Sequence, residues 1–177
     1  MTGRFPGGFM QTELNKVVAA LQEFYAQEAF LFEHDLGERT LTHRLAVHLE
    51  KQFQGWQVDC DYDRLGERTL RMPKGSIVST DDHLGKSVYP DIVVHRRAVP
   101  DNLLAIELRK ASNHQPPEHD LHKLCALTDP YLWFAYGIGV YLTLAKKSVT
   151  SDVYIGGARD QPLSDWLSER LKGAGLG

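Results

Sequence analysis

The amino-acid sequence predicts an α/β or α+β sandwich, and two patterns support this class. Segments whose apolar residues recur every three or four positions alternate with segments in which they recur every second position or run on continuously. The resulting order is helix, strands, helix, strand, helix. The 177 residues are 42% hydrophobic and show no shift in composition, so we expect a single domain over residues 1–177 with a substantial core.

The N-terminal part predicts two helices. After a glycine-rich start, apolar residues recur at helical spacing over about residues 12–33, which indicates an amphipathic helix. A second helix is expected from Gly37, because Leu41 opens a series in which every fourth residue is apolar. Gly55 ends this series, since glycine commonly terminates helices.

The next segments predict strands. From Trp56 to Asp63 apolar and polar residues alternate, which indicates a half-exposed strand with an acidic outer face. A partner strand is expected over Thr69–Met72. The polar stretch over residues 73–87 is long enough to be a functional loop.

A hairpin follows at the centre of the predicted sheet. Residues 91–95 and 103–109 are almost continuously apolar and are separated by a turn that contains Pro100, which predicts an antiparallel pair. Apolar side chains on both sides of these strands favour a sheet that is covered on both faces.

The C-terminal part predicts two more helices and further strands. Helical spacing returns over residues 118–128, after a loop at 113–117. Residues 137–144 predict a strand, and residues 153–155 a short one. An amphipathic helix over residues 162–172 closes the chain.

Two acids stand at the ends of the central hairpin. Asp91 begins its first strand and Glu107 lies near the end of its second, 16 residues later, so the hairpin brings the two carboxylates together. Neighbouring carboxylates repel unless a cation lies between them, and hard oxygen ligands favour Mg²⁺, Mn²⁺ or Ca²⁺. The pair therefore predicts a site for a divalent ion.

The residues after Glu107 add positive charge. Side chains alternate along a strand, so Arg109 shares the face of Glu107, while Leu108 and Lys110 share the other face. A metal ion held by two carboxylates, with a cation beside it, suits phosphodiester hydrolysis: the ion lowers the pKa of a bound water, and the cation offsets charge on the phosphate.

This arrangement resembles the PD-(D/E)xK nuclease superfamily, which includes many restriction endonucleases and Holliday junction resolvases. The resemblance rests on Pro90 and Asp91, an apolar strand, a turn, and a second apolar strand that ends in the letters ELRK. It implies a restriction-endonuclease-like, three-layer α/β/α fold with an αβββαβ core and a mixed sheet. The core would cover about residues 37–145, with the N-terminal helix as an addition.

The resemblance also implies a set of metal ligands. Asp91 and Glu107 would bind Mg²⁺, for which Mn²⁺ can substitute, and the backbone carbonyl of Leu108 would be a further ligand. Many members complete the site with a glutamate on the first core helix. Glu38 is the candidate here, because it lies on the inward stripe of its helix, three residues before Leu41.

The chain departs from the family at one position. The usual lysine of the motif is Arg109, and Lys110 stands one residue late and on the other face of a regular strand. Arginine stays protonated near neutral pH, so Arg109 would stabilise charge on phosphate rather than act as a base. Lys110 would serve only if a bulge turned it inward. The expected catalytic set is Asp91 and Glu107 with Arg109 or Lys110.

Nucleic acid, with DNA favoured, is the expected partner. The net charge of −3 gives no general attraction to phosphate, so contacts would be local. Lys123 on the helix after the hairpin is one candidate contact. Arg96 and Arg97 form another at the end of the strand that Asp91 begins, and a merely charged strand end is an equal alternative.

Several residues have structural alternatives. Glu107 and Arg109 can form an ion pair with no further role, and Glu38 is favoured in the first turn of a helix by the helix dipole alone. Asp59, Asp61 and Asp63 could add a carboxylate to the metal site, but a row of acids on one strand face is typical of a solvated surface. The eight histidines show no spacing typical of zinc ligands.

Two alternative functions stay open beside the nuclease. A catalytically weakened or inactive nuclease-like module could bind nucleic acid or a protein, and an ordinary α/β interaction domain would use its acids structurally. No apolar run is long enough for a membrane helix, the start lacks a signal core, and the two cysteines form no paired motif, so we expect a cytoplasmic protein. A homodimer is one option, with the N-terminal helix as its candidate face.

Overall fold

The computed structural model describes residues 7–65, 68–69 and 89–177. The functional loop expected over residues 73–87 lies outside the described residues, as does all but the first residue of the strand expected over Thr69–Met72.

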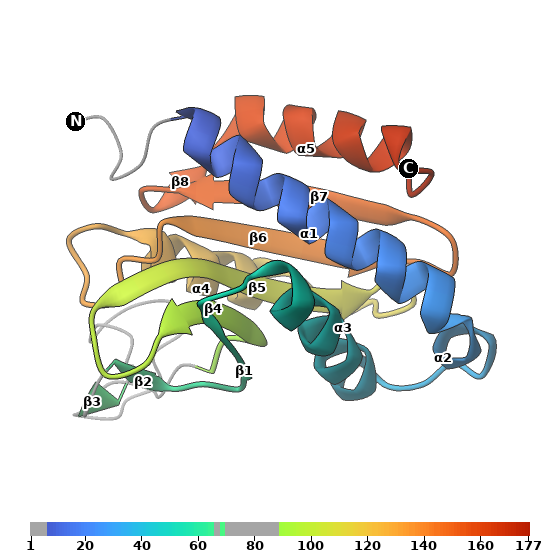
Figure 1. Cartoon of the computed structure of the whole chain (residues 1–177), viewed down its shortest axis with the longest axis horizontal. Coiled ribbons are helices and arrows are strands. Elements are labelled where there is room, and N and C mark those ends of the chain that lie inside the picture. The colour runs from blue at the N-terminus through green and yellow to red at the C-terminus, as the bar shows by residue number, and fades with distance from the viewer. Residues whose placement is uncertain (1–6, 66–67, 70–88) are drawn as a thin grey trace.

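Along the described chain, three helices are followed by five strands, a helix, three strands and a final helix (Figure 1). The helices are α1 (Gly7–Gln27), α2 (Ala29–Glu33), α3 (Glu38–Gln52), α4 (Glu118–Thr128) and α5 (Gln161–Gly173). The strands are β1 (Gln57–Cys60), β2 (Arg64–Leu65), β3 (Arg68–Thr69), β4 (Ile92–Arg96), β5 (Asp101–Lys110), β6 (Ile138–Leu144), β7 (Val149–Ile155) and β8 (Ala158–Arg159). The predicted α/β class is confirmed.

A six-stranded mixed sheet, in the order β1-β4-β5-β6-β7-β8, forms the centre of the molecule. β1, β4 and β5 are antiparallel neighbours, so the expected central hairpin is present. β5 and β6 run parallel and are connected through α4, because two parallel neighbours need a crossover between them. β7 and β8 continue the sheet in antiparallel order, and β2 and β3 form a separate pair.

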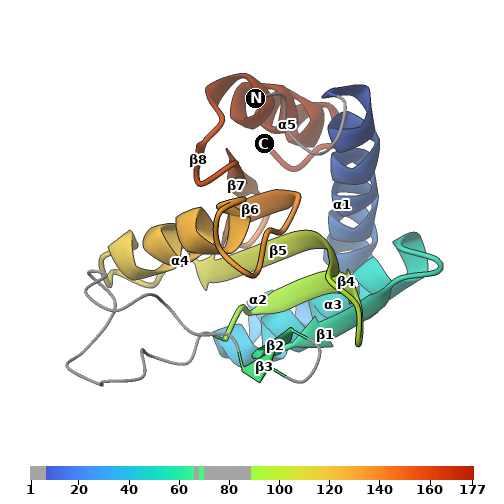
Figure 2. The same ribbon diagram turned by 90° about the vertical axis from the view of Figure 1, so that its left-hand side faces the viewer.

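The helices cover both faces of this sheet (Figure 2). One apolar cluster joins α1, α3 and α5 to one face, which presents Ile106 and Leu108 of β5. A second cluster joins α4 to the other face, which presents Ala105 of β5 and Tyr141 of β6. Neighbouring residues of β5 therefore point to different helices, as its almost continuously apolar sequence predicted.

The first predicted helix differs from the structure. It begins earlier than expected, at Gly7, and is interrupted at Glu28 before the short helix α2. The interruption lets Phe32 fold back against α1, where its ring stacks on Tyr25 with centroids 4.8 Å apart and meets the edge of Phe24 at 5.6 Å. Apolar spacing alone could not reveal this break, because the same residues are apolar in both arrangements.

The edge of the sheet near the C-terminus also extends beyond the prediction. β7 covers Val149–Ile155, whereas only residues 153–155 were expected, and β8 was not expected. Ser151 occupies a buried position of β7 and thereby hides the alternation of apolar residues. Asp152 of β7 forms an ion pair with Arg159 of β8.

The helix α4 packs closely on the sheet at β6. A Cβ atom built on Gly139 of β6 would lie 2.9 Å from Cγ2 of Thr128 and 3.3 Å from Cδ2 of Leu124, so only glycine lets α4 approach this closely. Leu124 lies beside Lys123, whose side chain is thereby directed at β5. Among the described residues, no helix is long and apolar enough to cross a membrane.

Candidate metal and phosphate site

The strand β5 extends beyond the start of β4, and acidic side chains occupy its open edge. Pairing of β4 with β5 begins at Ile92 and Ile106, so the last residues of β5 have no partner in β4. Oδ2 of Asp91 accepts the N–H of Leu108 at 2.8 Å, and Oε1 of Glu38 accepts the N–H of Lys110 at 2.9 Å. The carboxylates of Asp91 and Glu38 thus accept two backbone N–H groups of β5 that β4 does not reach.

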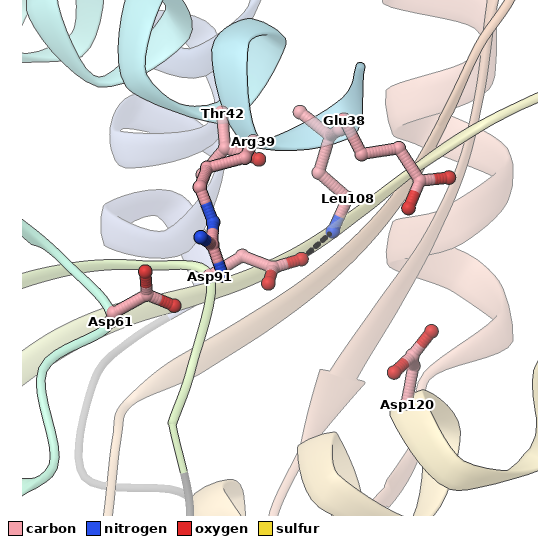
Figure 3. A pocket seen from close by; sticks show the side chains of 7 residues that line it. All are labelled: Glu38, Arg39, Thr42, Asp61, Asp91, Leu108 and Asp120. Carbon is pink, nitrogen blue, oxygen red and sulfur yellow. Dashed lines mark hydrogen bonds between the residues drawn. The ribbon is translucent and has the colours of Figure 1, made fainter.

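These acids line a pocket of about 310 Å³ at the edge of the sheet (Figure 3). Its walls come from α3, from the segments that follow β1 and precede β4, from β5, and from the start of α4. The lining residues are Glu38, Arg39, Thr42, Asp61, Asp91, Leu108 and Asp120. Four carboxylates and one guanidinium therefore surround a space that is large enough for a small anion with a cation.

Asp91 and Glu107 occupy facing positions across the hairpin. The pairing of Ile92 with Ile106 places them opposite each other, one residue further along. Glu107 is completely buried, and burial raises its pKa well above the ordinary value, with the charge of Asp91 adding to the effect. Burial also raises the pKa of Asp91 to about 6, although the N–H of Leu108 and the charge of Lys123 act in the other direction. Burial disfavours the charged forms of both acids, and a bound cation would stabilise these charged forms.

Lys123 supplies the positive charge nearest to this pair. Its Nζ lies 2.5 Å from Oε2 of Glu107 and 3.9 Å from Oδ1 of Asp120, and it donates a hydrogen bond to the carbonyl of Tyr89 at 3.1 Å. Burial lowers the pKa of Lys123, but the charges of Glu107, Asp91 and Asp120 outweigh this and raise it. Its ammonium therefore stays charged at neutral pH.

Arg109 faces the same side of β5 as Glu107, but its donors are used elsewhere. Nη1 donates to the hydroxyl of Tyr141 at 3.1 Å, and Nη2 donates to the carbonyl of Asn113 at 3.0 Å and to that of Gln115. The side chain is buried. Arg109 thus stabilises the loop between β5 and α4 through hydrogen bonds. The ionic partner of Glu107 is Lys123 rather than Arg109.

Lys110 points away from the facing acids. Its Nζ lies 2.5 Å from Oδ1 of Asp35, in the connection between α2 and α3. Its backbone N–H is held by Glu38, whose Oε1 also accepts a hydrogen bond from Nδ2 of Asn113 at 2.8 Å. Glu38 therefore does not cap its own helix, where no side-chain cap is present, but links α3 to the end of β5.

The two arginines at the other end of β4 lie apart from the pocket. Arg96 lies five positions after Asp91 along the strand, or roughly 16 Å away. Arg97 pairs with Asp59, and its Nε lies 2.7 Å from Oδ2 of that residue. Arg96 approaches Asp101 at 3.4 Å and stacks over Trp56, with 4.9 Å to the ring centroid. Both side chains are more than half exposed, at 54% and 56%.

The facing pair offers carboxylate oxygens, the type of ligand that a hard divalent cation would take. Oε1 of Glu107 is buried and accepts no hydrogen bond from a described residue. N–H and C=O of one strand residue point to the same side, so the carbonyl of Leu108 is directed at the same edge as its N–H, which Asp91 accepts. Within the described ranges no group of three or more His, Cys, Asp or Glu side chains is arranged to hold a metal. Water or substrate oxygens would complete the coordination.

Four residues that line the pocket are not among the site residues expected from the sequence: Arg39, Thr42, Asp61 and Asp120. Asp61 was interpreted as part of a solvated strand face, but it lines the pocket, because the chain turns there with a positive φ of 49° at this residue. Arg39 was not singled out. Its only signal in the sequence is its position directly after Glu38.

Comparison of the chain with protein-family models, with curated proteins and with solved structures finds no match.

Proposed function

We propose that this protein is a divalent-metal-dependent nuclease that hydrolyses phosphodiester bonds of nucleic acid, with DNA as the favoured substrate. The observation that carries the proposal is the pair Asp91 and Glu107, which face each other at the ends of two adjacent strands with the ammonium of Lys123 beside them. A catalytic ion needs ligands whose positions are fixed, and rigid strands can fix Glu107 in β5 and Asp91 directly before β4.

The order of elements supports the same proposal. α3 precedes three antiparallel strands, β1, β4 and β5, and α4 then leads to β6, which is parallel to β5. This order corresponds to the αβββαβ core that a restriction-endonuclease-like fold would have. The proposed acids also lie where that core would place them, at the start of its second strand and near the end of its third.

The residues divide the proposed chemistry between them. Asp91, Glu107 and the carbonyl of Leu108 would hold Mg²⁺ or Mn²⁺, with Glu38 on the neighbouring wall of the pocket. When bound, such an ion supplies a water of lowered pKa and a positive charge beside the phosphate. The N–H of Leu108 fixes the carboxylate of Asp91, so that its orientation does not depend on the ion.

Lys123 takes the role that the sequence assigned to Arg109 or Lys110. It is a charged ammonium in contact with Glu107, whereas Arg109 is bound to the loop after β5 and Lys110 to Asp35. A cation held in a largely dry site stabilises charge that develops on phosphate more strongly than an exposed one. We assign this stabilisation to Lys123.

The test uses the full chain with single-stranded, duplex and branched DNA and with RNA, in Mg²⁺, in Mn²⁺ and in chelator. We expect metal-dependent cleavage of at least one DNA, at least 100-fold slower in Asp91→Asn and Glu107→Gln. Glu169→Gln, which changes an exposed acid on α5, is the matched control and should cut like the parent. Absence of cleavage, or equal cleavage by the site variants, would refute the enzyme.

One observation favours a second candidate, a nuclease-like module that binds nucleic acid without cutting it. Lys123 already compensates the charge of Glu107, and no third carboxylate is grouped with the facing pair in the described part of the chain. This candidate predicts binding of DNA without turnover in any metal.

Two further features belong to the proposal. We place the protein in the cytoplasm, where its two free cysteines, Cys60 and Cys125, would stay reduced. Cleavage of both strands of a duplex requires a second copy or two binding events, and light scattering in the presence of duplex DNA tests for a dimer.

A further inference from the structure

Arg39 lies in an acid-lined pocket and has no partner among the residues that the structure describes. It lies in the first turn of α3, is exposed, and lines the pocket together with four carboxylates. No hydrogen bond or ion pair joins its guanidinium to a residue that the structure describes. Every other arginine whose side chain is described has such a partner; these are Arg44, Arg96, Arg97, Arg109, Arg159 and Arg170.

The orientation of Arg39 directs its donors into the pocket. In Figure 3 its side chain extends from α3 toward the side of the pocket where Asp61 and Asp91 lie. Thr42 also lines the pocket, one helical turn further along α3, so a hydroxyl and a guanidinium share one face of this helix.

A phosphate could not enter this pocket without compensation for its acids. Glu38, Asp61, Asp91 and Asp120 all carry or can carry negative charge, and a dianion or monoanion among them would be repelled. Arg39 is the cationic side chain among the lining residues that the structure describes. The planar fork of a guanidinium matches two oxygens of one phosphate, which an ammonium cannot do.

We infer that Arg39 binds a phosphate of the substrate backbone and holds it in the pocket. This inference rests on the proposed function and adds a phosphate-binding residue that the sequence did not indicate. Arg39 approaches from the layer of α3, and Lys123 from the layer of α4 on the other face of the sheet. The backbone of the nucleic acid would therefore be held between the two layers at the open edge of β5.

The experiment measures binding and cleavage separately. Binding is followed by fluorescence anisotropy with a fluorescein-labelled phosphorothioate oligonucleotide, which resists hydrolysis, in Mg²⁺. We expect Arg39→Ala to weaken binding roughly 10- to 100-fold and Arg39→Lys to weaken it less. The slope of log Kd against log salt should fall by about one. In cleavage, Arg39→Ala should raise KM more than it lowers kcat.

The control variant is Arg170→Ala, which removes an exposed arginine of α5 that contacts Asn15. It should bind and cut like the parent. Arginine and alanine both favour helices, so Arg39→Ala should fold normally, and its melting temperature checks this. Unchanged anisotropy in Arg39→Ala would overturn the inference, while loss of cleavage in Asp91→Asn would still support the nuclease.

A failure of the proposed enzyme can also be told apart from a failure of the inference about Arg39. If the parent binds the oligonucleotide but cuts no substrate, the proposed enzyme fails, and weaker binding by Arg39→Ala still supports its role as a phosphate contact. If the parent neither binds nor cuts, both the enzyme and the inference are overturned.

Discussion

The ammonium of Lys123 lies 2.5 Å from the carboxylate of Glu107, although the two residues come from a helix and a strand on different layers of the fold. Glu107 is completely buried, and its other carboxylate oxygen accepts no hydrogen bond from a described residue. The pair thus joins α4 to the end of β5 at the place where Asp91 also faces Glu107. We expect both the stability of the protein and its proposed chemistry to depend on this contact.

Removal of the ammonium should destabilise the protein. Lys123→Met leaves a buried carboxylate without its cation, so we expect the free energy of unfolding to fall by about 3–5 kcal/mol. Denaturation by urea at pH 7.5 measures the change. The double variant Lys123→Met, Glu107→Gln removes both charges and should recover much of the loss. Equal losses in the single and double variants would show that the ion pair is not the cause.

Neutralisation of Asp91 should stabilise the protein at neutral pH. The pKa of this carboxyl is raised from 3.8 to about 6 in the folded state, so the folded protein binds the proton more tightly than the unfolded chain. Its contribution is fully favourable below about pH 4 and is lost as the pH rises through 6. Asp91→Asn, whose amide oxygen can still accept the N–H of Leu108, should gain on the order of 2–3 kcal/mol at pH 7.5 and little at pH 4.

The comparison of melting curves at these two pH values checks this prediction. A variant that is less stable than the parent at pH 7.5 would show that Asp91 is well compensated in the folded state without a metal.

Magnesium should stabilise the parent through the same acids. An ion that binds only the folded state raises the free energy of unfolding by RT ln(1 + [Mg²⁺]/Kd), so the melting temperature should rise with concentration and return in chelator. Glu107→Gln should abolish the rise, whereas Glu169→Gln should keep it. A rise of the same size in Glu107→Gln would place the ion elsewhere.

Arg109 should matter for stability more than for chemistry. Arg109→Lys cannot bond to Tyr141, Asn113 and Gln115 together, because it lacks the planar fork, so we expect a loss of about 2–3 kcal/mol. Well below its melting temperature, however, the variant should keep most of its cleavage rate. The matched variant Lys123→Arg should lose cleavage under the same conditions. If Arg109→Lys loses cleavage and Lys123→Arg keeps it, the catalytic role belongs to Arg109 instead.

Replacement of Gly139 by a larger residue should destabilise the folded protein. A Cβ atom at this position meets Thr128, Tyr154 and Leu124 at 2.9–3.3 Å, so Gly139→Ala should lower the free energy of unfolding by roughly 1–3 kcal/mol. The displaced α4 should also carry Lys123 away from Glu107 and slow cleavage. Gly173→Ala, where a Cβ has no neighbour within 4 Å, is the control.

Strong local patterns explain what the sequence could predict of the fold. The helix expected over residues 118–128 coincides with α4, and the strand expected over 137–144 begins only one residue before β6. Both segments carry an uninterrupted period and sharp turn signals at their ends. The break at Glu28 and the serine in β7 depend on contacts with distant residues, and a period in the sequence does not record them.

The candidate site was likewise predicted from the sequence only where it depends on local patterns. Asp91 and Glu107 face each other because they lie in one hairpin, whose two strands are close in the sequence. Glu107 and Arg109 share one face because side chains alternate along a strand. The cation that serves Glu107 could not be identified in this way, because it depends on how closely α4 packs against β5. Arg39 gave no signal, since an arginine in an exposed helical turn is ordinary until the pocket around it is known.

The measurement that tests the central claim most directly is the rate at which Glu107→Gln and the parent cleave the same DNA in Mg²⁺. The account predicts cleavage by the parent that stops in chelator, and a rate at least 100-fold lower in Glu107→Gln, with that variant still folded by circular dichroism. Equal rates in the two proteins, or cleavage that continues in chelator, would contradict it.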